Sequence, residues 1–236
     1  MRTLLALGAV VPPLLAGAFV LAATGDRRRA INRTLGLWGD LGTRAAGIRL
    51  EVTGQAYLES ARPAVFLLNH RSGVDPILAC ALLRRDFVAV AKHEIRRNPL
   101  LGPAFAFAGV VFVDRTGGAP GALDPALAAL RSGLSIAIAP EGTRARDEAL
   151  GPFKTGAFRI ALAARAALVP IVIHNADDVL PRGGWVMTAA RVRVDVLAPV
   201  STADWDAARL DAHIETVRRQ FLETLASRPA SPRRRT

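Results

Sequence analysis

Short apolar runs separated by amphipathic segments follow one another along most of the chain. Apolar or alternating runs predict strands over residues 48–52, 64–68, 87–91, 110–113, 135–139, 168–173 and 192–197. Apolar residues at helical spacing predict helices over residues 26–46, 76–84, 99–108, 124–131, 155–166 and 203–225. Because uniformly apolar strands alternate with helices, the pattern predicts an α/β fold, with one domain built on a largely parallel central sheet flanked by helices.

The N-terminal segment has a different pattern, since residues 3–24 contain no charged side chain. As a helix this segment would be roughly 30 Å long, about the hydrocarbon thickness of a bilayer. Pro12 and Pro13 lie in its middle and predict a kink. We expect a membrane anchor, either a kinked spanning helix or a bent helical hairpin within one leaflet. A signal peptide cleaved near Ala22 and a buried helix of a soluble protein are the alternatives.

A cluster of arginines directly follows the apolar segment, at positions 27, 28, 29 and 33. Positive charge at this place resists export, so we expect the protein at the cell membrane with the following domain on the cytoplasmic side. The helix predicted over residues 26–46 either lies on the membrane surface or packs against the domain. The chain thus divides into an anchor with a basic amphipathic helix (residues 1–46), a main domain (47–227) and a disordered basic tail (228–236).

Composition narrows the possible partners. With 51% hydrophobic and 22% charged residues among 236, the chain is able to bury a full core, which excludes a disordered protein. The net charge of +11 favours a polyanion, either nucleic acid or an anionic membrane surface, although arginine enrichment from a GC-rich genome would look the same. No nucleic-acid-binding motif is present, so we expect the membrane surface. The single cysteine, Cys80, excludes an intramolecular disulfide and a thiolate metal cluster, and no metal site is expected.

The first candidate for chemistry is the sequence Asn-His-Arg-Ser-Gly-Val-Asp-Pro at residues 69–76, which follows a predicted buried strand. Imidazole is the side chain best suited to accept a proton from an alcohol that attacks a carbonyl group, and His70 supplies one here. Asp75 is close enough to hold the ring N–H and fix the tautomer, as in a Ser-His-Asp triad. The alternative is structural, with Asp75 as an ordinary helix N-cap before Pro76.

The second candidate is the sequence Pro-Glu-Gly-Thr-Arg at residues 140–144, after another predicted strand. Gly142 allows close backbone approach, Thr143 offers a hydroxyl, and Arg144 is able to grip a phosphate with two parallel hydrogen bonds. Glu141 is expected to orient Arg144 or a neighbouring amide. The alternative is an ordinary polar turn.

Two further cations follow predicted strands, namely Lys92 and Arg115. Parallel strands end at one edge of a sheet, so His70, Lys92, Arg115 and Arg144 are expected to converge there. A base beside several cations predicts an enzyme that activates an alcohol on a phosphorylated substrate.

These residues, in this order, resemble the lysophosphatidic acid acyltransferase family. The family motif N-H-x4-D matches residues 69–75, a glycine followed by an apolar strand ending in D-R matches 109–115, F-P-E-G-T-R matches 139–144, and a V-P strand matches 169–172. Residues 91–95 and 153–156 are similar to the family's A-K-x-E-L and F-K-x-G. Ala139 replaces the aromatic residue of the third motif, which leaves the packing behind that loop in doubt.

The resemblance implies transfer of a fatty acyl chain from acyl-CoA or acyl-carrier protein to the sn-2 hydroxyl of 1-acyl-sn-glycerol-3-phosphate, giving phosphatidic acid. It implies His70 as the base and Asp75 as its orienting partner. It also implies phosphate binding by Lys92, Arg115 and Arg144, in a pocket shaped by Glu141, Gly142 and Thr143. No metal and no cofactor besides the acyl donor are implied.

Three alternatives stay open at this point. Similar enzymes acylate other lysolipids, such as lyso-ornithine lipid, and the motifs do not choose between these acceptors. A membrane-bound hydrolase would use a serine nucleophile, and Ser72 lies near His70, but the G-x-S-x-G motif is absent. A non-catalytic, basic membrane or nucleic-acid-binding protein would also account for the charge.

Overall fold

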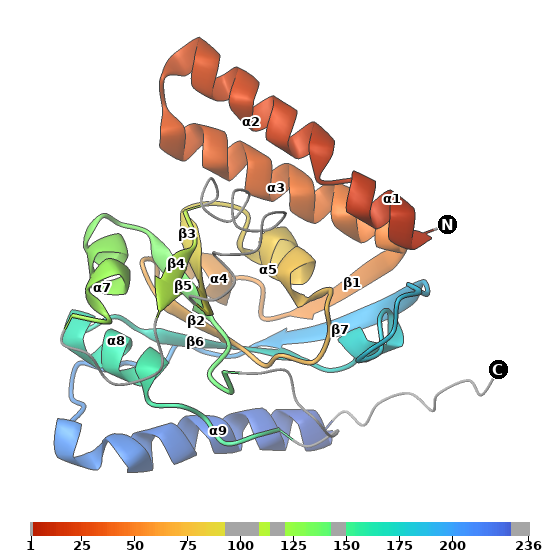
Figure 1. Ribbon diagram of the computed structural model, residues 1–236. Helices are drawn as coiled ribbons and strands as arrows, with labels where there is room; N and C mark the ends of the chain where they lie inside the picture. Colours follow the sequence, from red (N-terminus) through yellow and green to blue (C-terminus); the bar gives the residue numbers. More distant parts are fainter. Residues whose placement is uncertain (1, 93–108, 114–120, 143–149, 228–236) are drawn as a thin grey trace.

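The computed structural model describes residues 2–92, 109–113, 121–142 and 150–227 (Figure 1). Within them, seven strands form one sheet in the order β1-β7-β6-β2-β5-β3-β4. The bounds are β1 Ile48–Thr53, β2 Val65–Leu68, β3 Phe87–Lys92, β4 Val111–Val113, β5 Ser135–Ile138, β6 Leu168–Ile173 and β7 Ala190–Val196. All neighbours are parallel except β6 and β7, so β1 and β7 run opposite to the other five strands.

Two hydrophobic clusters cover the two faces of the sheet. In β2, Phe66 and Leu68 belong to one cluster, whereas Val65 and Leu67 belong to the other. Every residue of β2, β5 and β6 is buried, which is why these strands are continuous apolar runs in the sequence. The predicted α/β fold with a largely parallel, helix-flanked sheet is therefore confirmed.

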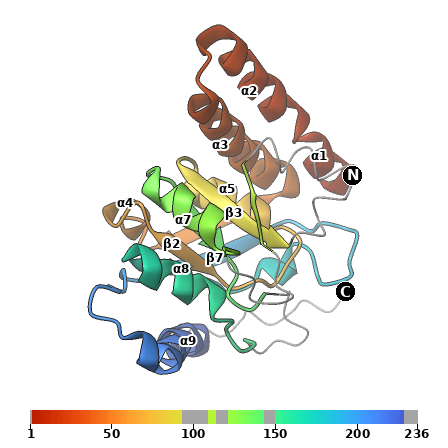
Figure 2. The ribbon, with the colours of Figure 1, turned by 60° about the vertical axis from the view of Figure 1, so that its left-hand side comes forward.

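The helices of the domain lie on both faces of the sheet. They are α4 Tyr57–Ser60, α5 Asp75–Leu83, α7 Asp124–Arg131, α8 Gly156–Ala164 and α9 Leu210–Ser227, with short 3-10 turns at Ala176–Asp178 and Ala207–Arg209. Figures 1 and 2 agree that α9 lies on the opposite side of the sheet from the N-terminal helices. The helix predicted from residue 203 starts at Leu210, because residues 203–204 form a turn and Ala207–Arg209 form a 3-10 turn. The helix predicted over residues 99–108 lies outside the described residues.

The N-terminal segment forms two helices, α1 Arg2–Gly8 and α2 Val11–Thr24, which run antiparallel to α3 Arg27–Ala46 (Figure 1). The break comes before the prolines, since Pro12 and Pro13 occupy the first turn of α2. Proline is tolerated in a first turn, where its missing N–H would have no partner in any case. The predicted kink is thus a short interruption a few residues earlier in the chain.

The outer surface of α1 and α2 is apolar and exposed. Within Arg2–Thr24, an 18-residue window has a mean hydropathy of 2.3 and only 18% of that window is buried, so by length and composition the segment could cross a membrane. Leu4, Leu15 and Phe19 expose 74%, 67% and 74% of their surface. This exposure disagrees with the alternative of a buried helix in a soluble protein.

Close packing joins the N-terminal helices to each other and to the domain. A Cβ atom on Gly17 of α2 would lie 1.9 Å from Thr34 Oγ1 of α3, and one on Gly39 would lie 2.5 Å from the Ala81 nitrogen of α5. Only glycine permits such approaches. The alternative in which α3 packs against the domain is therefore correct.

Polar contacts reinforce the packing of α3. Asp40 on α3 binds both terminal nitrogens of Arg84, at 2.6 and 2.9 Å. Near the start of α3, Arg28 and Asn32 both donate to Asp86 Oδ1, at 2.7 and 2.8 Å. Both contacts hold α3 against the segment that directly follows the C-terminal end of α5.

Candidate active site

Five parallel strands, β6, β2, β5, β3 and β4, end at the same edge of the sheet. His70 follows β2, Glu141 follows the adjacent β5, and Lys92 is the last residue of the next strand, β3. At a strand spacing of about 4.8 Å, β3 lies about 10 Å from β2. The strand ends named in the sequence analysis are therefore neighbours in the sheet. Three of the predicted phosphate-site residues, Arg115, Thr143 and Arg144, lie outside the described residues.

The side chains of His70 and Asp75 are in direct contact. His70 Nδ1 lies 2.6 Å from Asp75 Oδ2, and the two side chains are 30% and 8% exposed. A carboxylate at this distance favours the tautomer that carries its proton on Nδ1, which leaves Nε2 with a lone pair able to accept a proton. The pair is thus arranged so that Nε2 is able to accept a proton.

Asp75 also shapes the turn that carries His70. Its Oδ2 atom accepts the backbone N–H groups of Arg71 and Ser72, at 2.8 and 2.9 Å. Asp75 is the first residue of α5, and the residue at the N-cap position is Val74. The carboxylate thus binds the amides that precede it rather than those of the helix, so the N-cap alternative is wrong.

Asn69 fixes the start of the same turn. Its amide nitrogen donates to the carbonyl oxygen of Ile173 at 2.8 Å, and its Oδ1 accepts the Ile173 N–H at 2.7 Å. The Asn69 side chain, which is 1% exposed, forms the two hydrogen bonds with β6 that a strand backbone would form. It lies just beyond the last residue of β2. In the sequence Asn69 is only one position of a motif, and no local pattern indicates its partner.

Glu141 connects the two predicted motifs. Its Oε1 accepts the backbone N–H of His70 at 2.9 Å, and its Oε2 accepts the backbone N–H of Gly151 at 3.2 Å. Burial raises the pKa of the Glu141 carboxyl, although these two hydrogen bonds and the nearby His70 and Arg71 oppose the rise. Of the two roles considered for Glu141, the structure places the carboxylate on neighbouring amides.

The loop after Glu141 begins with Gly142, whose backbone φ of 76° lies in the left-handed region that favours glycine. The far end of this loop is held from α9, because Arg218 donates to the carbonyl oxygens of Gly151 and Leu150, at 3.2 and 3.3 Å. Hydrogen bonds thus hold the predicted phosphate loop at both of its described ends, at Glu141 and at Leu150 and Gly151.

Comparison with known proteins gives the family. Residues 49–174, which contain the His70–Asp75 pair and Glu141, match the sequence profile of the family described as Acyltransferase. The chain belongs to the Acyltransferase family.

Relatives within this family carry a common name. The chain is 34% identical over 179 residues to 1-acyl-sn-glycerol-3-phosphate acyltransferase alpha of Ovis aries, covering 75% of this chain and 62% of the relative. It is 29% identical over 189 residues to the 1-acyl-sn-glycerol-3-phosphate acyltransferase of Limnanthes douglasii, covering 78% and 65%. The chain therefore spans less than two thirds of the length of these relatives. The predicted resemblance to the lysophosphatidic acid acyltransferase family is confirmed.

One solved structure has a similar fold over the whole chain. The 1-acyl-sn-glycerophosphate (LPA) acyltransferase PlsC of Thermotoga maritima superposes with a TM-score of 0.78 at 24% identity, covering 98% of this chain and 97% of that one. At this identity the likeness concerns the fold. It includes the N-terminal helices as well as the sheet, because almost all of both chains is covered.

In this member of the Acyltransferase family, Ser72 is a structural residue. It is fully buried, and its hydroxyl donates to the carbonyl oxygen of Leu180 at 2.7 Å. A hydroxyl held in this way does not face His70, so the hydrolase with a Ser72 nucleophile loses its basis. Among the described residues, no group of three or more histidine, cysteine or acidic side chains is placed to hold a metal ion.

Proposed function

We propose that the protein transfers a fatty acyl chain from acyl-CoA or acyl-carrier protein to the sn-2 hydroxyl of 1-acyl-sn-glycerol-3-phosphate, forming phosphatidic acid. The observation that carries the proposal is the 2.6 Å contact between His70 Nδ1 and Asp75 Oδ2, in the segment that matches the family. The names of the sheep and Limnanthes relatives support the choice of acceptor.

The reaction needs one base and no covalent intermediate with the protein. His70 Nε2 removes the proton of the acceptor hydroxyl while its oxygen attacks the thioester carbonyl of the donor. The tetrahedral intermediate then collapses, the carbon–sulfur bond breaks, and the imidazolium returns the proton to the leaving thiolate. Asp75 stabilises the imidazolium and keeps the ring in place. Such a base contributes about 100- to 10,000-fold to the rate.

Binding of the acceptor phosphate is assigned to Lys92, Arg115 and Arg144, with Gly142 and Thr143 shaping the loop. The position of Lys92 at the end of β3, two strands from His70, supports this assignment. The basic net charge of +11 supports an anionic substrate and an anionic membrane surface. No cofactor is required, since the acyl donor is a co-substrate.

Membrane attachment is assigned to α1 and α2. At 14 residues, α2 would span only about 21 Å, less than the hydrocarbon thickness of a bilayer. Its packing along α3, through Gly17 and Thr34, supports a hairpin that enters one leaflet rather than a helix that crosses both. The arginines at the start of α3 support a cytoplasmic position for the domain.

The proposal is tested by acyl transfer in vesicles. The full chain is assayed with labelled acyl-CoA and acyl-carrier protein, and with 1-acyl-sn-glycerol-3-phosphate, lyso-ornithine lipid and other lysophospholipids as acceptors. We expect transfer to 1-acyl-sn-glycerol-3-phosphate that falls at least about 100-fold in His70→Ala. His213→Ala is the matched control, because His213 stacks on Trp205 at 4.5 Å and has no assigned role.

Each contrary outcome removes a different part of the proposal. Transfer only to lyso-ornithine lipid would keep the mechanism and overturn the phosphate site. Full activity in His70→Ala, with an unchanged unfolding temperature, would overturn the general base. Silence with every donor and acceptor would favour the non-catalytic membrane protein.

A further inference from the structure

The loop between the 3-10 turn Ala176–Asp178 and β7 carries an unusually exposed aromatic residue. Trp185 exposes 87% of its surface and the following Val186 exposes 73%. A tight turn precedes them, in which the Gly184 N–H donates to the Pro181 carbonyl oxygen at 2.9 Å and Gly183 adopts a φ of 74°. A defined turn therefore presents two large apolar side chains to the outside.

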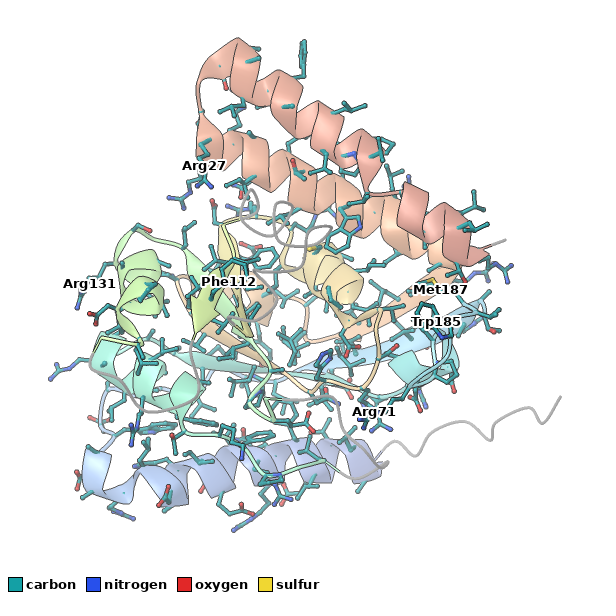
Figure 3. All side chains as sticks on the ribbon, viewed as in Figure 1. Arg27, Arg71, Phe112, Arg131, Trp185 and Met187 are labelled. Atoms are coloured by element: carbon teal, nitrogen blue, oxygen red, sulfur yellow. The ribbon has the colours of Figure 1, made fainter. Side chains whose placement is uncertain are left out.

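This loop is fastened to the first turn of α1. The hydroxyl of Thr3 donates to the Trp185 carbonyl oxygen at 2.9 Å and accepts the Met187 N–H at 3.0 Å. Figure 3 shows Trp185 and Met187 close to α1, although more than 180 residues separate Met187 from Thr3 along the chain. Met187 packs against the core, so the loop is anchored on its inner side. Trp185 is therefore exposed on a loop whose backbone is held in place by hydrogen bonds.

The surroundings of Trp185 are apolar or basic. Leu4 and Leu5, which follow Thr3, expose 74% and 54% of their surface. Residues 181–190 contain no acidic side chain, and Arg182 lies in the same turn. Large exposed apolar patches mark sites that contact a membrane or another protein. Here the patch continues the apolar surface of Arg2–Thr24, the one described segment that could enter a bilayer.

We propose that Trp185 and Val186 form a second membrane-contact site, outside the helices α1 and α2 but adjoining α1, in which the indole ring lies at the boundary between headgroups and acyl chains. Tryptophan prefers this boundary because its ring is apolar while its N–H donates a hydrogen bond. Arg182 in the same turn suits anionic headgroups. This inference rests on the proposed membrane attachment of the protein.

The same loop is connected to the catalytic turn. The Ser72 hydroxyl donates to the Leu180 carbonyl oxygen at 2.7 Å, and Arg71 pairs with Asp177 at 3.7 Å. The segment from Asp177 to Met187 therefore extends from the turn that carries His70 to the first turn of the anchor. Its contact with lipid would place the bilayer surface beside the route by which a lysolipid reaches the site.

The test uses tryptophan fluorescence of the full chain in vesicles of phosphatidylethanolamine and phosphatidylglycerol. The double variant Trp38→Phe/Trp205→Phe leaves Trp185 as the sole tryptophan. The lipids carry bromine either near the headgroup or near the methyl end of the acyl chain. We expect a shift of the emission to shorter wavelength, and quenching that is several-fold stronger with shallow bromine than with deep bromine.

The matched control, Trp38→Phe/Trp185→Phe, retains Trp205, which stacks on Phe158 and His213 on the α9 side of the sheet. Its emission should be unchanged by bromine. Adding Thr3→Val to the variant Trp38→Phe/Trp205→Phe removes the hydroxyl that holds the loop. This change should reduce the quenching by bromine near the headgroup severalfold.

Unquenched Trp185 emission in the presence of bound vesicles would overturn the proposal. A blue shift that depends on protein concentration and is insensitive to bromine would also overturn it, and would indicate contact with a second copy of the chain. Acyl transfer measured in the same samples separates this inference from the proposed function. Transfer without quenching refutes only the second contact, and quenching without transfer refutes only the assigned reaction.

Discussion

Replacing Glu141 with glutamine tests whether this residue acts by positioning His70. The carboxylate accepts two backbone N–H groups, those of His70 and Gly151, with one oxygen each. Glutamine has nearly the same shape but only one acceptor oxygen. One of the two backbone N–H groups must therefore face the glutamine NH₂ group. If it is the N–H of His70, the turn that carries His70 loses the hydrogen bond that now holds it.

The magnitude follows from two opposing effects. A hydrogen bond to a charged group contributes about 1.5–3 kcal/mol, and a buried amide left without a partner costs about 1–3 kcal/mol. Burial raises the pKa of Glu141, however, so the neutral glutamine recovers part of the cost of burying a charge. We expect Glu141→Gln to lose about 1–2 kcal/mol of stability. A misplacement of the base by about 1 Å costs roughly 100-fold in rate, so kcat should fall about 10- to 100-fold.

The assay separates positioning from substrate binding. Steady-state acyl transfer should show the fall in kcat with the acceptor KM changed by less than about threefold. Arg218→Ala provides the comparison, since Arg218 holds the same loop end through the Gly151 carbonyl but has no contact with the His70 amide. It should leave kcat within about threefold of the parent enzyme.

Either of two results would refute this reasoning. A rise in acceptor KM with unchanged kcat would mean that Glu141 touches the acceptor. An equal loss of kcat in Arg218→Ala would mean that Glu141 acts by holding the loop end at Gly151 and not by positioning His70.

The raised pKa of Glu141 adds a check on stability. A raised pKa in the folded state means that Glu141 stabilises the protein most below its ordinary value of 4.5 and loses this contribution as pH rises through the raised value. The unfolding-temperature deficit of Glu141→Gln should therefore be larger at about pH 4 than at about pH 7.

Two further predictions concern residues outside the proposed chemistry. Ser72→Ala removes two buried hydrogen bonds, the one donated to the Leu180 carbonyl oxygen and the one accepted from the Val74 N–H. It should cost about 2 kcal/mol by thermal unfolding while acyl transfer persists, and loss of transfer in a folded variant would revive a catalytic serine. Burial opposes ionisation of Asp86, but the bonds from Arg28 and Asn32 hold its pKa below the ordinary 3.8. Its contribution to stability is thus present above that value and is lost as pH falls through the lowered one. Asp86→Asn should lower the unfolding temperature near pH 7 but have little effect at about pH 2, and an equal deficit at both would contradict the ion pair.

The strands were predictable because buried parallel strands are uniformly apolar. The predicted bounds of β2 and β6 differ from the observed ones by at most one residue. Strand direction was not predictable, since the apolar pattern of β7 is the same whether it runs parallel or antiparallel to β6. The four-residue helix α4 Tyr57–Ser60 was missed because it is about one turn long and has no amphipathic period.

The candidate site was predictable where its partners are close in sequence. His70 and Asp75 are five residues apart, so their contact follows from the motif. The partners of Asn69 and Ser72 lie 104 and 108 residues away, and no local pattern indicates them. For Glu141 the chemistry allowed two roles, and only the three-dimensional arrangement places its carboxylate on the His70 amide.

The long-range bonding of the catalytic turn bears on the order of folding. Asn69 bonds to a residue 104 positions away, His70 to one 71 positions away, and Ser72 to one 108 positions away. Contacts of such sequence separation form slowly, because the intervening chain must first be brought together. During synthesis, the turn emerges early but acquires its native bonds only after residue 180 has been added. Activity should therefore return last during refolding, after most of the helical signal.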